Sequence, residues 1–175
     1  MSQSSVRNQI AAFIKAANIP AVEYVFRGGP YRTDGSLFKL GANNGHGAVL
    51  FVHLDQSNES RITVPSLAPT NLSGAVGQKQ VQYVVSIVIM YKFKVQELGQ
   101  GQDVDVWVDP LDAIIDALKT RIRSDPNQGD ASKIFQAGQD PIDLRLVQDL
   151  PVEIPNGILF SLARLQYNVT EIIVA

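Results

Sequence analysis

The sequence has no cysteine among its 175 residues. This absence excludes disulfide bonds, a thiolate nucleophile and any zinc site with cysteine ligands. It also has only two histidines. Because ordinary zinc sites need three or four ligands, a metal centre in this chain would have to recruit carboxylates.

Charge is scarce as well. Charged residues make up 18% of the chain, and 15 basic residues nearly balance 17 acidic ones. The net charge of −2 argues against a protein that binds nucleic acid mainly by neutralising phosphates. An apolar content of 45% is too high for a disordered chain. Together with the length, these values predict a single domain over residues 1–175 with one hydrophobic core.

The sequence predicts neither a signal peptide nor a membrane span. Residues 1–9 contain no apolar run of the kind that a secretory signal needs. The most apolar stretch, residues 80–91, is shorter than the roughly twenty residues of a spanning helix. We therefore expect a soluble protein, made in the cytoplasm, that makes no membrane contact.

Hydrophobic periodicity predicts two amphipathic helices. The first covers Val6–Ala17, and Pro20 ends it. The second covers Asp109–Arg123, with Asp109 as the N-cap and Pro110 at the first helical position, where a missing N–H is tolerated. Basic residues in its last turns match the negative end of the helix dipole.

Strict alternation predicts a long strand at Val81–Val95, which would span roughly 50 Å at about 3.3 Å per residue. The other predicted strands are Val22–Phe26, Ala48–Leu54, Arg61–Val64, Asp103–Val108, Ile142–Leu150 and Gly157–Val174. The expected fold class is therefore α+β, with a mostly antiparallel β-sheet and two α-helices packed on one face.

Two finer predictions concern breaks in these strands. The turn-forming residues 55–59 are expected to separate Ala48–Leu54 from Arg61–Val64. In Gly157–Val174 the apolar positions change face near residues 163–164. This change of phase predicts either a β-bulge or a strand that is covered on both sides.

Two groups of residues could bind a ligand. The glycine-rich stretch 28–47 fits no phosphate-binding motif, so we interpret it as a surface loop. His46, His53 and Asp55 could form a metal-binding set. We favour instead a loop histidine and a strand-end histidine that do not meet.

Three further patterns are interpreted structurally. Tyr83, Tyr91 and Phe93 have the spacing of a base-stacking platform, but they share their face with aliphatic residues, as a core does. An acidic run is expected to be mostly solvated; its members are Asp103, Asp105, Asp109, Asp112 and Asp116. No serine lies in a Gly-x-Ser-x-Gly motif. We therefore predict no catalytic, cofactor-binding or metal-binding residue, no cofactor, and no enzymatic activity.

Three lightly charged irregular segments cover residues 27–47, 65–79 and 124–141. Long loops are uncommon in compact domains and are usually functional. These segments keep large apolar side chains, which suggests arms that are completed by a neighbouring subunit. The candidate subunit-interface residues are Tyr31, Phe38, Leu67, Leu72, Val76 and Phe135.

Four features of element order resemble the tail terminator family of long-tailed bacteriophages and the related small neck proteins of the head–tail junction. These features are the helix Val6–Ala17, the long strand Val81–Val95, the Asp-Pro-capped helix Asp109–Arg123 and the strand pair that closes at Ala175. The resemblance covers roughly half of the chain.

This resemblance implies a structural virion protein that is assembled in the host cytoplasm. Such proteins form a homo-oligomeric ring, commonly of six copies, that caps the tail tube protein, stops its polymerisation and docks the head connector or stopper protein. DNA would pass through the lumen without specific binding, which suits the near-neutral charge. The alternatives are another head–tail connector or a tail-tube component, and, from a different class, a small-ligand or metal-binding domain.

Overall fold

A computed structural model describes residues 3–28, 47–62, 78–94, 105–129, 134–135, 145–154 and 158–174. Two helices and six strands lie in these ranges: α1 (Gln3–Lys15), β1 (Val22–Arg27), β2 (Gly47–Ile62), β3 (Gln78–Lys94), α2 (Asp105–Ser124), β4 (Ile134–Phe135), β5 (Arg145–Ile154) and β6 (Ile158–Val174). None of the helices within these ranges combines the length and apolar content needed to cross a bilayer.

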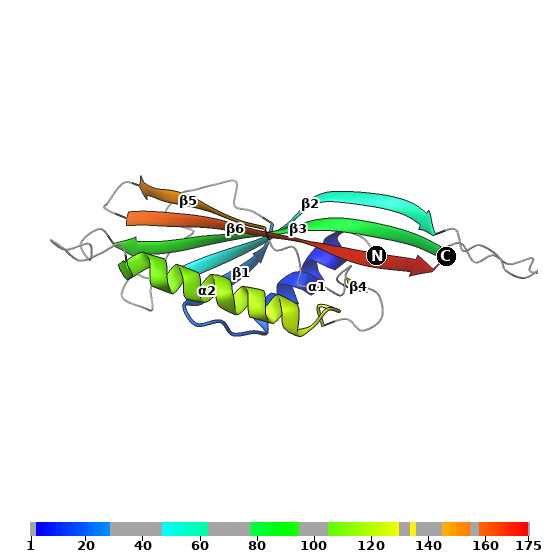
Figure 1. Cartoon of the computed structure of the whole chain (residues 1–175), viewed down its shortest axis with the longest axis horizontal. Helices are drawn as coiled ribbons and strands as arrows, with labels where there is room; N and C mark the ends of the chain where they lie inside the picture. Colours follow the sequence, from blue (N-terminus) through cyan, green and yellow to red (C-terminus); the bar gives the residue numbers. More distant parts are fainter. Residues whose placement is uncertain are drawn as a thin grey trace, which may run out of the picture.

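The six strands form one sheet in the order β1-β2-β3-β6-β4, and β5 also pairs with β6. The pair β1–β2 is parallel, whereas the other strand pairs within the described residues are antiparallel. Figure 1 shows a strongly twisted sheet whose long strands cross near its middle, with both helices on one side. The predicted α+β class with a mostly antiparallel sheet is therefore confirmed.

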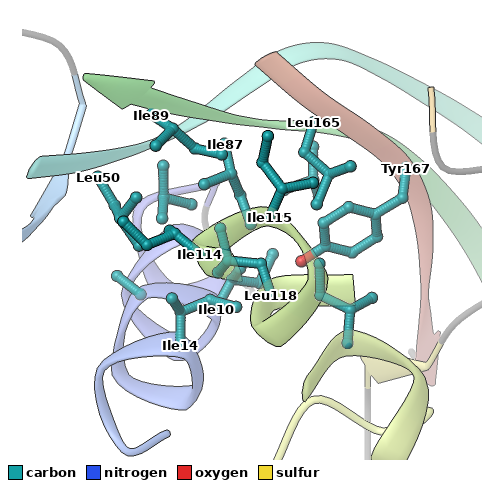
Figure 2. Packing of buried hydrophobic residues seen from close by; sticks show 14 of the residues in the cluster. Ile10, Ile14, Leu50, Ile87, Ile89, Ile114, Ile115, Leu118, Leu165 and Tyr167 are labelled. Carbon is teal, nitrogen blue, oxygen red and sulfur yellow. The ribbon is translucent and has the colours of Figure 1, made fainter. Parts of the chain in front are cut away.

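The main core lies between the helices and one face of the sheet (Figure 2). Its fully buried side chains include Ile10, Ile14, Leu50, Ile87, Ile89, Leu111, Ile114, Ile115, Leu118, Ile122 and Tyr167. The two helices also contact each other. The Arg121 guanidinium lies 3.9 Å from the centre of the Phe13 ring, and its Nε donates a hydrogen bond of 3.2 Å to the Phe13 carbonyl.

The start of α2 differs from the prediction, because residues 105–108 are helical and not part of a strand. Valine at every second position in Asp103–Val108 fits a strand, but so short a stretch cannot distinguish the two periods. Pro110 consequently lies inside the helix and not at its first position, and Asp109 is not the N-cap. The missing N–H of Pro110 removes one hydrogen bond of the helix.

A second difference concerns β2, which runs unbroken through residues 55–59 where a turn was predicted. The reason is its neighbour: β3 is long enough to pair with β2 from Gly47 to Ile62. The register shifts between Leu54 and Gln56, so the turn-forming residues are accommodated by a β-bulge. Residues 55–60 are exposed, which explains their polar character.

The change of phase in β6 is not a bulge, since its register with β3 is continuous from Ile158 to Val174. Leu165 belongs to the main core, whereas Phe160 joins a second cluster with Val49 and Phe51 on the opposite face. β6 therefore has buried apolar residues on both faces, but both helices lie on one side of the sheet (Figure 1), so coverage of the strand on both sides stays a prediction. β5 extends to Ile154, four residues beyond the predicted end.

The first residues of the predicted irregular segment 124–141 are ordered against the core. The Asp125 carboxylate accepts hydrogen bonds from the backbone N–H groups of Asn127 and Gly129. This turn buries Gln128, whose Oε1 accepts a hydrogen bond of 3.0 Å from the Tyr167 hydroxyl. This part of the segment therefore completes the core and is not an arm.

Candidate interaction surface

Among the strands that the structure describes, β1 forms one edge of the sheet, next to the C-terminal end of α1. In the connection after α1, Asn18 has a φ of 46° and Ala21 has a φ of 64°. Two left-handed residues in so short a connection reverse the chain sharply. β1 therefore lies beside α1, the helix that precedes it, and runs parallel to β2.

Two aromatic side chains project from this edge strand into solvent. Tyr24 is 50% exposed and Phe26 is 40% exposed, and they are the large apolar side chains that are exposed in the described part of the chain. Their rings stack at 5.7 Å, and the Phe26 ring stacks on that of Phe51 at 5.6 Å. The result is an aromatic ladder that leads from a buried position on β2 to the outside of the sheet.

The register places this ladder on the sheet face opposite the helices. Tyr24 pairs with Val49, and Phe26 pairs with Phe51. Val49 and Phe51 belong to the second apolar cluster, in which Phe160 is also buried and against which Val88 and Met90 pack. The second face is thus apolar in its middle, and the ladder extends this apolar band to the edge.

A groove of about 420 Å³ runs along the same edge. Its walls are the C-terminal end of α1, the connection at Asn18 and Ile19, and β1 from Val22 to Phe26. Lys15 and Glu23 place one charge of each sign on its lining. The combination of open strand edge, exposed aromatics and adjoining groove is the geometry that receives an added β-strand.

A polar cluster crosses β2, β3 and β6 away from this edge. The Ser86 hydroxyl donates a hydrogen bond of 2.5 Å to the Asp55 carboxylate, which also accepts one of 3.0 Å from the Gln166 amide. The same amide lies 3.0 Å from the Ser86 hydroxyl oxygen. These hydrogen bonds link the side chains of β2, β3 and β6 to one another.

His53 lies near this cluster, on the strand that carries Asp55. Burial lowers the pKa of His53, and the nearby Arg7 and Arg164 guanidinium groups lower it further, against the opposing effect of Asp55. The histidine is therefore neutral at neutral pH. Within the described ranges there is no group of three or more potential metal ligands, and His46, the other histidine of the alternative metal-binding set, lies outside them.

We expect Asp55→Ala to lower the free energy of unfolding by about 1–2 kcal/mol, because Ser86 is buried and would lose its carboxylate acceptor. Asp55→Asn is the matched control, since its side-chain oxygen can still accept the hydrogen bond. Urea denaturation of the three proteins measures both effects. Equal stability of Asp55→Ala and the parent chain would show that the cluster adds nothing to the fold.

Most of the predicted subunit-interface residues lie outside the described residues, namely Tyr31, Phe38, Leu67, Leu72 and Val76. Phe135 lies in β4, where its backbone pairs with that of Thr170 on β6. The greater parts of segments 27–47 and 65–79 are likewise outside the described ranges. Their predicted role as arms stays a prediction.

Two other patterns from the sequence, the aromatic spacing and most of the acidic run, lie within the described residues. Tyr83, Tyr91 and Phe93 are buried in the main core, so they offer no base-stacking platform. In the acidic run, the side chains of Asp109, Asp112 and Asp116 are exposed on α2, as expected.

Sequence reasoning did not identify Tyr24 and Phe26 as surface residues. A signal was present, because they occupy alternate positions in Val22–Phe26 and therefore share one face. Their exposure depends on β1 lying at the sheet edge, and the strand order is not encoded in the local pattern. A scan against protein-family models gave no match to this chain, and a search of curated proteins gave none either.

Proposed function

We propose that this chain is a structural virion protein whose copies form a ring at the end of a bacteriophage tail tube. The ring would terminate tail polymerisation and join the tail to the head connector. The observation that carries the assembly part of this proposal is the edge strand β1, where Tyr24 and Phe26 are exposed beside an open groove. Exposed apolar surface of this kind is typical of protein–protein contact sites.

The shape of the subunit supports the same proposal. The 17 residues of β3 span about 55 Å, whereas the 20 residues of α2 span about 30 Å. The three long strands therefore extend well beyond α2, as Figure 1 shows. The sheet is thus longer than either helix that packs on it, and we propose that its projecting strand ends meet a neighbouring copy.

The placement of this ring on a phage tail rests on element order. The helix, long strand and closing strand pair that carry the resemblance correspond to α1, β3 and the pair β5–β6, and the second helix corresponds to α2 without the expected cap at Asp109. The low charge of the chain suits a channel through which DNA passes without being held. We propose the tail tube protein and the head connector as partners.

Negative-stain electron microscopy of the purified chain tests this function. We expect single closed rings with a central channel. Long stacked tubes would favour a tail-tube component, and a stable monomer that retains a metal ion through dialysis would favour the small-ligand alternative.

Deleting residues 67–77 tests whether the second irregular segment takes part in assembly. We expect the variant to remain folded, by circular dichroism, but to form no rings, because Leu67, Leu72 and Val76 are removed together. Rings indistinguishable from those of the parent chain would show that this segment is not needed for assembly.

A further inference from the structure

We propose that the ring is closed by sheet continuation, in which β1 of one copy pairs antiparallel with β5 of the next copy. This inference rests on the proposed homo-oligomeric ring and names its subunit contact. In this contact, the β5 edge of a second copy of this chain lies against the edge of β1 and the adjoining groove.

The two edges lie at the same level of the sheet. Successive register partners connect β1, β2, β3, β6 and β5 at one level of the sheet. These partners are Phe26, Phe51, Val88, Arg164 and Val147. β1 and β5 are thus the opposite ends of one row. In the part of the chain that the structure describes, no further strand pairs beyond either end.

The strand directions also match. β1 is parallel to β2, and three successive antiparallel pairings lead from β2 to β5. β1 and β5 therefore run in opposite directions. When one copy is placed beside another in the same orientation, the meeting edges form an antiparallel pair, which is slightly the more stable kind of pairing.

Such a contact joins two different surfaces, and a contact of this type generates a ring if the rotation between neighbours closes the circle. A contact between two β1 edges would instead give a closed dimer, because the same surface would be used twice. The head-to-tail contact is the one that accounts for both open edges.

The backbone of β1 has donors directed to this edge. The Gly28 N–H donates to the Val52 carbonyl on β2 at 2.9 Å. Because successive N–H groups along a strand point in alternate directions, those of Arg27 and Val25 point away from β2. An incoming β5 backbone can accept from both groups.

The side chains of β1 favour such a contact over a solvated edge. Native edge strands are commonly protected by charged residues, proline or bulges. β1 carries Glu23, Arg27 and a register irregularity between Val22 and Tyr24, but it also presents Tyr24 and Phe26 beside the edge, where they would pack over the neighbouring strand. Burial of their exposed parts removes apolar surface from water, which stabilises the assembly.

Arg27→Pro tests the proposal with little expected change to the isolated subunit. Proline removes the N–H of residue 27 and places its ring on the open side, where edge strands tolerate it. The matched control is Arg27→Ala, which also loses the hydrogen bond of 2.9 Å from Arg27 to Asn8 but keeps the N–H. We expect the parent chain and Arg27→Ala to form rings and Arg27→Pro to be a folded monomer by light scattering and circular dichroism.

The other possible results separate the proposed ring from the proposed β1–β5 contact. A monomeric parent chain would contradict the proposed ring itself, whereas rings of Arg27→Pro would leave the ring intact and overturn the β1–β5 contact. A parent chain that forms only dimers would favour the β1–β1 contact and overturn the proposal. If Arg27→Pro does not fold, hydrogen exchange of residues 22–28 in the assembled and diluted parent chain decides: slower exchange on assembly supports the contact, and equal exchange overturns it.

Discussion

Leu118→Ala is expected to lower the free energy of unfolding by about 2–5 kcal/mol. Leu118 is fully buried on α2, where it packs into the core shared by both helices and the sheet (Figure 2). The substitution loses the transfer free energy of the removed methyl and methylene groups and leaves a cavity that the close-packed surroundings fill only in part.

Urea denaturation monitored by circular dichroism measures this loss. Asp116→Ala on the same helix is the control, because Asp116 is exposed and its ion pair with Lys119, at 3.2 Å, is a surface pair. We expect this control to change stability by less than about 0.5 kcal/mol. If Leu118→Ala were no less stable than the control, α2 would not be packed on the sheet as described.

Alkaline pH is expected to destabilise the fold steeply above pH 10. Burial raises the pKa of Tyr167, and burial together with a hydrogen bond of 2.9 Å to the Glu171 carboxylate raises that of Tyr83. Both hydroxyls stay protonated in the folded chain at pH values where the unfolded chain, with tyrosine pKa values near 10, has lost these protons. The folded state then binds more protons than the unfolded state, so stability is complete below pH 10 and falls as the pH rises.

Each of these tyrosines contributes a slope of about 1.4 kcal/mol per pH unit in this range. Unfolding free energies measured between pH 8 and 11.5 give the slope directly. Tyr167→Phe removes one titrating group, so we expect a shallower slope for this variant, although at pH 8 it is less stable because the Gln128 amide loses its donor. A slope that is unchanged by the substitution would contradict the burial of the Tyr167 hydroxyl.

The parts of the fold that could be predicted are those with long, regular patterns. The apolar stripe from Leu111 to Ile122 identified α2, and uninterrupted alternation identified β3 almost to its ends. These patterns persist over several turns or many strand positions, so the helical and extended periods are clearly distinct. The α+β class follows from the same elements.

The errors arose where a neighbouring strand, and not the local sequence, determines the structure. Residues 55–59 have turn-forming character, but the backbone of β3 pairs with β2 along this stretch. A single bulge at Asp55 lets the pairing continue on both sides. Residues 105–108 alternate like a strand, yet they continue the helix that follows them. Tertiary pairing and helix propagation outweighed local preference at both places.

The candidate interaction surface was the least predictable feature. It depends on which strands lie at the edges, and that order is set by pairings between residues far apart in the sequence, such as β3 with β6. The predicted subunit contacts lie mostly in segments outside the described residues and stay a prediction, and the sequence pattern did not single out Tyr24 and Phe26 as exposed. These two side chains are surface residues only because β1 is an edge strand.

The most direct test of the central claim is the mass of the purified chain in solution, measured by multi-angle light scattering over a range of concentrations. A closed ring predicts one discrete mass that does not grow with concentration, near six times 19.1 kDa if six copies form it. A mass of 19.1 kDa at every concentration would contradict the account.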